Sequence, residues 1–211
     1  MKSKFPSRAI ALLILIIIPL GFYFYYKQKI DALPRKAAKL PVLFSAPSFK
    51  YKTQLGDTLT NDSLKGSIYV TDFIFTNCRS VCTDLSKVMA QLQQNFVSNG
   101  VLKLVSFSID PSRDSLQALI DYAARYGAAP HKWYFLLGDT ATTWNTVEKG
   151  FKVSVGYETD TSEAGYSFTH SNNLLLVDPE GQVRGIYNGL DPAEVDSLYN
   201  HLALLMAAKN L

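Results

Sequence analysis

Three residues of this chain have types that could bind a metal or exchange electrons. Cys78 and Cys82 are its only cysteines, and their spacing places both thiols on one face of the first turns of a helix. A strand-like run precedes them, so we expect them at a helix N-terminus, where the helix dipole and free N–H groups lower thiol pKa values. Arg79 adds a positive charge nearby. Thiols with lowered pKa values suit redox chemistry or metal binding.

A structural disulfide is the alternative use of these two cysteines, because we expect the domain to lie outside the cytoplasm. Closing so short a loop contributes only about 2 kcal/mol in the chain-entropy model, compared with about 4.7 kcal/mol for a loop of a hundred residues. Two cysteines are also too few for a disulfide framework or for a four-thiolate zinc or iron–sulfur site. We therefore favour a functional pair.

A third ligand could come from His170. It lies in a polar loop, residues 165–173, directly before a strand-like run. A loop histidine on its own is more often solvated, but here the predicted sheet would bring this loop to the start of the cysteine helix. Two thiolates and an imidazole form a soft donor set that suits copper, whereas a structural zinc site normally takes four protein ligands. His131 and His201 are expected at the surface, and we assign them no role.

The elements that must position these residues form an α/β pattern. The sequence predicts strands at 67–75, 101–109, 133–137, 174–177 and 182–187, and helices at 85–96, 110–127, 143–149 and from Pro192 onward. Strands that alternate with helices, followed by a hairpin and a last helix, predict a mixed central sheet flanked by helices. The order of these elements is that of a thioredoxin-like fold.

The N-terminal part of the chain has the composition of a membrane anchor. Residues 1–40 carry eight basic residues and one acidic residue, a net +7, whereas residues 41–211 carry 13 basic and 17 acidic residues, a net −4. An acidic domain argues against a nucleic-acid partner. The 18 uncharged residues at 9–26 would reach about 27 Å as a helix, near the thickness of a bilayer core. A cleaved signal peptide is the alternative, but the apolar run is long and lacks a small-residue cleavage site behind it.

We therefore expect four segments: a short cytoplasmic tail (1–8), a transmembrane anchor (9–26), a linker (27–48) and one globular domain (49–211). Basic residues flank the anchor on both sides, so their distribution does not orient it. The small size of the preceding tail favours a single pass with the domain on the periplasmic or extracytoplasmic side. The short N-terminal segment favours a bacterial inner membrane over a mitochondrial protein.

Together these motifs resemble the Sco/SenC family, membrane-anchored thioredoxin-like copper proteins that assist the assembly of cytochrome c oxidase. The resemblance covers about residues 47–206. A CxxxC motif alone is weak evidence, but its combination with a later Asp-Pro-x-Arg-Asp stretch and a late His-Ser pair is specific. The segments that carry the resemblance are Phe73–Cys82, Val105–Asp114, Trp133–Asp139, Thr169–Ser171 and Val177–Gly181.

The resemblance implies that Cys78, Cys82 and His170 bind one copper ion and that the two thiols can form a reversible disulfide. It also implies two partners, a copper-receiving subunit of cytochrome c oxidase with a dinuclear copper site and a thiol-redox protein. Asp110 and Arg113 match the family's Asp-Pro-x-Arg-Asp stretch, and we interpret them as a helix cap and a local ion pair. The chain departs from the usual family residues around the ligands at Arg79, Ser80, Thr83 and Thr169.

The leading interpretation is a metallochaperone rather than a turnover enzyme. Other functions are compatible with the sequence. One is a membrane-tethered thiol–disulfide oxidoreductase that acts on the cysteines of other proteins. Redox thioredoxins typically carry CxxC and a facing proline, whereas this motif is one residue longer and the facing loop offers His170, which favours copper. Peroxide reduction by one low-pKa cysteine and a purely structural membrane protein are the remaining alternatives.

Overall fold

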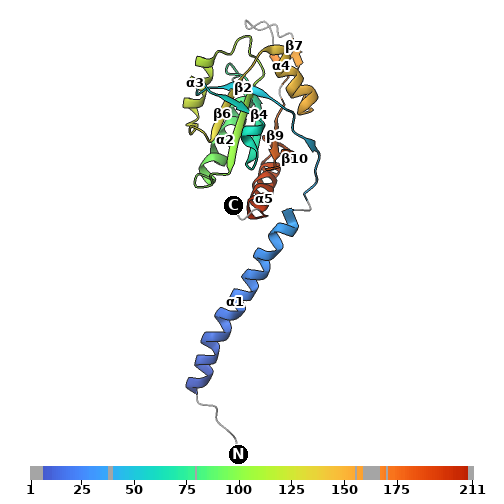
Figure 1. The fold of residues 1–211 in the computed structure, drawn as a ribbon. Coiled ribbons are helices and arrows are strands. Elements are labelled where there is room, and N and C mark those ends of the chain that lie inside the picture. The colour runs from blue at the N-terminus through green and yellow to red at the C-terminus, as the bar shows by residue number, and fades with distance from the viewer. Residues whose placement is uncertain are drawn as a thin grey trace, which may run out of the picture.

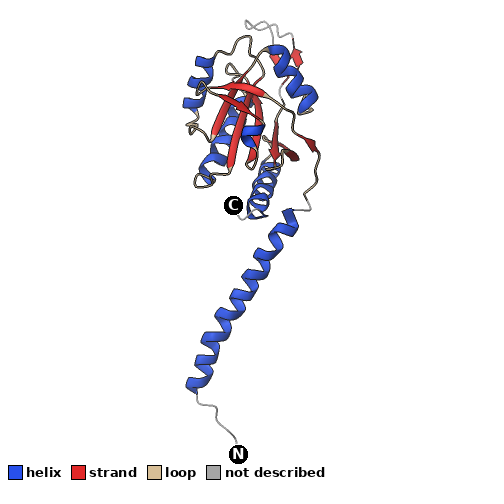
Figure 2. Cartoon of the chain, in the orientation of Figure 1, coloured by secondary structure: helices blue, strands red, loops and turns tan. Residues whose placement is uncertain are grey.

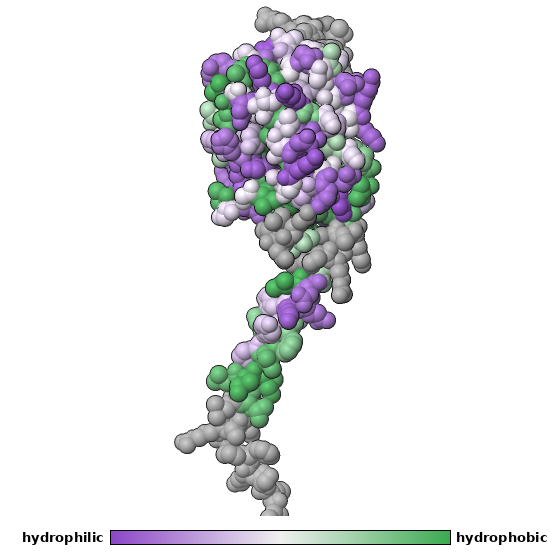
Figure 3. Space-filling model, in the orientation of Figure 1, coloured by the Kyte–Doolittle hydropathy of each residue, from purple (hydrophilic) through white to green (hydrophobic). Residues whose placement is uncertain are grey.

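The computed structural model describes residues 7–37, 40–78, 80–154, 156–158, 167–169 and 171–208. It consists of an α/β domain and one long helix, α1 (Ser7–Ala37), which projects away from that domain (Figure 1). Within α1, Leu13–Ala32 is long and apolar enough to cross a membrane, and none of this stretch is buried. Its apolar side chains form the hydrophobic band below the domain in Figure 3. The helix thus continues beyond residue 26, the expected end of the anchor.

One mixed sheet forms the centre of the domain, with the strand order β1-β10-β9-β4-β5-β6-β2-β3. The central strands β4, β5 and β6 are parallel, whereas the pairs on either side of them are antiparallel. A separate two-stranded sheet pairs β7 (Gly156–Glu158) with β8 (Ser167–Thr169). The main-sheet strands are β1 (Phe44–Ser45), β2 (Lys50–Thr53), β3 (Thr58–Thr60), β4 (Ile68–Ile74), β5 (Leu102–Ser108), β6 (Trp133–Leu137), β9 (Asn173–Val177) and β10 (Gln182–Asn188).

Helices cover the sheet, as Figure 2 shows in blue against red. α2 (Val81–Asn95) connects β4 to β5 and α3 (Leu116–Arg125) connects β5 to β6. Right-handed crossovers between adjacent parallel strands place both helices on the same face. α5 (Pro192–Ala208) lies beside α2, where the rings of Phe96 and Tyr199 stack with their centroids 6.0 Å apart. The predicted mixed sheet with flanking helices is confirmed.

The opposite face of the sheet is filled by aromatic side chains. Phe107 is fully buried, and its ring contacts Phe73 and Phe151 at centroid distances of 5.9 and 5.5 Å. Phe151 directly follows two short helices, α4 (Thr140–Trp144) and the π-helical turn η2 (Asn145–Gly150). Alternate residues of β4 therefore face either this aromatic cluster or the helices α2 and α3.

Several boundaries differ from the sequence-based prediction for local reasons. α3 begins at Leu116 and not at Asp110, because Ser115 caps it by accepting the Ala118 N–H at 3.1 Å. The single helix expected at 143–149 is the pair α4 and η2, which starts earlier because the Asp139 carboxylate accepts the Thr142 N–H at 2.9 Å. The short strands β1, β2, β3, β7 and β8 and the one-turn helix η1 (Asp62–Leu64) were not predicted.

The start of the domain is tied to the β9–β10 hairpin by Arg184. Its guanidinium donates to the carbonyls of Leu40 (2.6 Å) and Pro41 (3.1 Å) and pairs with Asp178 at 2.9 Å. Only 13% of the Arg184 side chain and 3% of the Asp178 side chain are exposed. The chain just after α1, within the segment expected as a linker, is therefore held against the sheet.

Candidate metal and thiol site

The two cysteines meet where β4 is followed by α2. Cys78 lies in the connecting loop, and its N–H donates to the Phe75 carbonyl at 3.2 Å. Cys82 lies in the first turn of α2, and its N–H donates to Cys78 Sγ at 3.4 Å. Both residues are present as thiols and both are buried, with 6% of Cys78 and 1% of Cys82 exposed. The structure thus brings the two thiols together at the start of the helix.

The sulfur of Cys78 takes the position of a helix cap. Ser80, the N-cap residue of α2, makes no side-chain cap hydrogen bond. The Cys82 N–H is one of the first-turn groups that lack a partner within the helix, and it points to Cys78 Sγ instead. This N–H and the helix dipole both stabilise negative charge on that sulfur. The stabilisation of a thiolate that we predicted for a helix N-terminus therefore acts on the sulfur of Cys78.

Cys82 has a different electrostatic environment. Its hydrogen bond with the Cys78 side chain, and then its burial, raise the pKa of the Cys82 thiol, and the charges of Cys78 and Asp72 act in the same direction. The prediction that the helix N-terminus lowers both thiol pKa values is wrong for Cys82, because a second thiol and the loss of water outweigh the dipole. The Cys82 thiol thus holds its proton to a higher pH than an exposed cysteine does.

A buried carboxyl group lies under α2 on the same face of the sheet. Asp72 in β4 is fully buried, and neither of its carboxyl oxygens has a hydrogen-bond partner of normal geometry in the described part of the chain. Desolvation raises the pKa of Asp72 to about 7, which the neighbouring Ser106 hydroxyl offsets in part. Sequence reasoning missed Asp72, although a lone acidic residue inside the apolar run 67–75 is a signal of a special environment.

Further polar groups connect α2 to α3 and join neighbouring strands of the sheet. The Tyr122 hydroxyl of α3 lies 3.3 Å from the Cys82 carbonyl, to which it donates, and 3.0 Å from Ser86 Oγ. On the sheet, Ser106 Oγ accepts the Trp133 indole N–H at 2.9 Å. The two contacts of Tyr122 hold the first turns of α2, and therefore Cys82, against α3, whereas the Ser106 contact joins β5 to β6.

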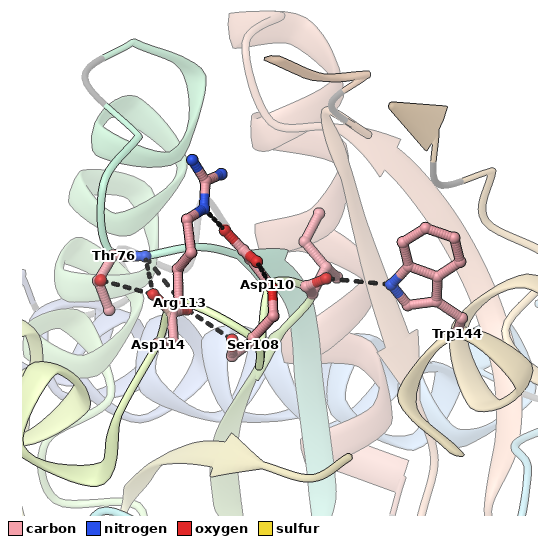
Figure 4. Close-up of polar contacts among 8 residues, drawn as sticks. Thr76, Ser108, Asp110, Arg113, Asp114 and Trp144 are labelled. Atoms are coloured by element: carbon pink, nitrogen blue, oxygen red, sulfur yellow. Dashed lines mark hydrogen bonds and ion pairs between the residues drawn. The ribbon is translucent and has the colours of Figure 1, made fainter. Parts of the chain in front are cut away.

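The loop between β5 and α3 lies beside the cysteine loop (Figure 4). Asp110 and Arg113 form an ion pair, which confirms that part of the prediction. Neither residue caps α3, since Ser115 does so, and the second part of the prediction is wrong. The neighbouring Asp114 was not predicted to have a role, yet its carboxylate accepts hydrogen bonds from Thr76 of the cysteine loop.

His170 lies outside the described residues, as does Arg79. The described chain ends β8 at Thr169 and resumes at Ser171, whose hydroxyl accepts the Asn173 N–H at 3.2 Å. Within the described ranges, no three His, Cys, Asp or Glu side chains are grouped closely enough to hold a metal ion. The two cysteines are therefore the part of the predicted ligand set that the structure brings together.

The other two histidines, His131 and His201, are far in sequence from the loop that contains His170. His131 is exposed, and its carbonyl accepts the Lys103 ammonium at 2.8 Å. His201 on α5 is only partly exposed, and its Nδ1 hydrogen-bonds the Tyr187 hydroxyl at 2.7 Å.

Comparison with known proteins agrees with this architecture. The model of the SCO1/SenC family matches residues 41–206. A SCO1 protein homolog from Bacillus subtilis (strain 168) is 30% identical over 162 residues, which are 76% of this chain and 82% of that protein.

Solved structures extend the similarity to three dimensions. BsSco, described as a member of the Sco family of cytochrome c oxidase assembly proteins with a disulfide switch, has a TM-score of 0.66 and 29% identity, over 80% of this chain and 96% of BsSco. Arabidopsis thaliana ScoI with copper bound has a TM-score of 0.63 and 25% identity, over 79% of this chain and 99% of ScoI. The predicted thioredoxin-like fold is confirmed, and the chain belongs to the SCO1/SenC family.

Proposed function

We propose that this protein is a membrane-anchored copper-binding factor that delivers copper, or reducing equivalents, during assembly of the dinuclear copper site of cytochrome c oxidase. The observation that carries this proposal is the pair of adjacent, buried thiols at the start of α2 in a chain of the SCO1/SenC family. The similarity to a copper-bound ScoI and to BsSco supports copper as the cargo and oxidase assembly as the setting.

The chemistry of the thiol pair suits Cu(I). Thiolates are soft ligands that select Cu(I), and an imidazole is a compatible third donor. We assign Cys78, Cys82 and His170 as the ligands of one copper ion. The N–H of Cys82 offsets charge on Cys78 Sγ, and the burial of both thiols excludes water that would compete for the metal. Because metal binding removes thiol protons, the raised pKa of Cys82 makes copper uptake weaker as the pH falls.

For the anchor, we propose a single pass through the inner membrane of a bacterium, with residues 1–8 as the tail and 9–26 as the anchor. The linker expected at 27–48 is shorter than predicted, because α1 runs to Ala37 and β1 already belongs to the main sheet of the domain expected at 49–211. The apolar, unburied stretch Leu13–Ala32 supports this arrangement. Lys29 lies over the Tyr25 ring at 5.1 Å, and paired aromatic and basic side chains of this kind favour the membrane–water interface. The domain would then face the periplasm.

Copper titration of the full chain in detergent micelles tests the proposal. The reduced protein should bind one Cu(I) in competition with a chromophoric chelator, and Cys78→Ser should abolish that binding. His170→Ala should weaken it, whereas the control His131→Asn should not. Asparagine suits that control because His131 has a φ of 59°, a conformation that asparagine tolerates. Unchanged affinity in His170→Ala would remove this residue from the site, and no binding by the wild type would refute the proposal.

A thiol–disulfide oxidoreductase is the second candidate, since the two thiols are hydrogen-bonded and Cys82 holds its proton against the neighbouring Cys78. Such a pair can attack a disulfide of a thiol-redox partner protein through Cys78 and resolve the mixed disulfide through Cys82. The copper-free, reduced protein should then reduce a protein disulfide with many turnovers when a thiol reductant is supplied. A stoichiometric reaction alone would favour the metallochaperone.

A further inference from the structure

We propose that Asp114 is a positioning residue of the cysteine site, whose carboxylate fixes the loop that presents Cys78. Asp114 lies in the β5–α3 connection, 38 residues from the loop segment that it holds. The copper part of this inference rests on the proposed function, but the effect on the thiols does not.

The Asp114 carboxylate accepts hydrogen bonds from residues at the ends of two separate strands (Figure 4). It accepts the Thr76 N–H, at 3.1 Å to one oxygen and 3.3 Å to the other, and the Thr76 hydroxyl at 2.6 Å. The Ser108 hydroxyl donates to its second oxygen at 2.5 Å. Thr76 follows β4 and Ser108 ends β5, so one side chain joins the carboxyl ends of two neighbouring parallel strands.

These contacts reach Cys78 through one main-chain hydrogen bond of the turn that follows β4. Thr76 is held by Asp114 on one side of a tight turn, in which the Cys78 N–H donates to the Phe75 carbonyl at 3.2 Å. Cys78 Sγ in turn accepts the Cys82 N–H at 3.4 Å. A change at Thr76 therefore moves the turn that sets the distance between Cys78 Sγ and the start of α2.

The chemistry of this position requires a carboxylate. Asp114 is 5% exposed, and desolvation raises the pKa of this carboxyl, while its hydrogen bonds with Ser108 and Thr76 act in the opposite direction. A side chain that costs free energy to bury is stabilised here by donors from Thr76 and Ser108. Asparagine has nearly the same shape, but its amide NH₂ would face one of these donors, so at least one hydrogen bond would be lost.

The test compares Asp114→Asn with Ser108→Ala in the full chain in detergent micelles. Ser108→Ala is the matched control, because it removes a hydrogen bond to the same carboxylate without touching the cysteine loop. The first measurement is the rate of iodoacetamide alkylation of the reduced, copper-free protein. The second is Cu(I) affinity by chelator competition, and tryptophan fluorescence verifies that each variant is folded.

We expect Asp114→Asn to weaken Cu(I) binding by about 10- to 100-fold, the usual effect of losing a group that orients a ligand. Its alkylation rate should differ from that of the wild type by at least about threefold. Ser108→Ala should differ from the wild type by less than about threefold in both its alkylation rate and its Cu(I) affinity. Equal behaviour of the two variants would overturn the inference. If the wild type binds no Cu(I), the proposed function fails, and the alkylation rates still decide the role of Asp114.

Thr76→Val keeps the test decisive if Asp114→Asn does not fold. It removes only the hydroxyl that donates to Asp114 and leaves the carboxylate in place. We expect its alkylation rate to change in the same direction as in Asp114→Asn, and a rate equal to wild type would overturn the inference. Where both variants fold, the double variant Asp114→Asn/Thr76→Val should lose no more copper affinity than Asp114→Asn alone, because the two substitutions disrupt the same contact between residues 114 and 76.

Discussion

Replacing Asp72 by asparagine should change how the stability of the domain depends on pH. Burial raises the folded-state pKa of Asp72 from 3.8 to about 7, so the folded protein holds this proton more tightly than the unfolded chain does. Below about pH 3.8 the group is protonated in both states and has no effect. As the pH rises towards about 7, ionisation favours the unfolded chain and the free energy of unfolding falls. Above about pH 7 the loss is complete and constant.

The size of this loss follows from the shift. Each pH unit between the two pKa values is worth about 1.4 kcal/mol, so the buried carboxyl costs on the order of 4 kcal/mol at pH 8. Asparagine cannot ionise, and the stability of Asp72→Asn relative to wild type should therefore rise by about 1.4 kcal/mol per pH unit between about pH 4 and 7. Burying the amide costs about 1–3 kcal/mol at every pH, which moves the offset between the two curves and leaves the slope unchanged.

Urea unfolding of the reduced, copper-free full chain in detergent micelles measures this difference. The protein has two tryptophans, and both Trp133 and Trp144 lie in the domain, so their fluorescence reports on the domain and not on α1. Asp196→Asn is the control, because that carboxyl is exposed on α5. Parallel curves for Asp72→Asn and wild type from pH 4 to 7 would refute the assignment of a buried carboxyl with a raised pKa.

Three further predictions concern stability and use the same unfolding measurement. Arg184→Ala should cost about 3 kcal/mol, because it leaves buried Asp178 without its cation; a loss below about 1 kcal/mol would mean that the pair behaves as an exposed one. Phe107→Ala should cost about 3–5 kcal/mol by opening a cavity in the aromatic cluster, and a smaller loss would show that the cluster collapses around it. Gly181→Ala should cost about 1–2 kcal/mol because its φ is +77°, whereas Gly100→Ala, with open space around its Cα, should cost less.

The elements of the domain that have a strong apolar pattern could be predicted from the sequence. β4 differs from the expected strand at 67–75 by one residue at each end, because β-branched and aromatic residues fill a strand that is buried on both faces. β2 and β3 could not be predicted in this way, since runs of four and three residues are too short to establish a period. The π-helical turn η2 depends on tertiary packing of its buried residues Thr146 and Val147, which no local pattern encodes.

In the candidate site too, some features follow from the local sequence and others depend on tertiary contacts. The spacing of Cys78 and Cys82 and the preceding strand were enough to predict both thiols near a helix N-terminus, although only Cys82 lies in the first turn and Cys78 lies in the loop before it. The raised pKa of the Cys82 thiol depends on its contact with the Cys78 side chain and on burial, neither of which the spacing contains. The contact of Asp114 with Thr76 joins segments 38 residues apart, so only the packing of β4 against β5 reveals it. The assignment of His170 stays a prediction.

X-ray absorption at the copper edge of the Cu(I)-loaded full chain tests the central claim most directly, because it counts the ligand atoms of each element. We predict two sulfur ligands and one nitrogen ligand in the wild type, and loss of the nitrogen contribution in His170→Ala with both sulfur ligands retained. A copper ion bound through sulfur alone in the wild type, or a nitrogen contribution that survives in His170→Ala, would contradict the proposed site.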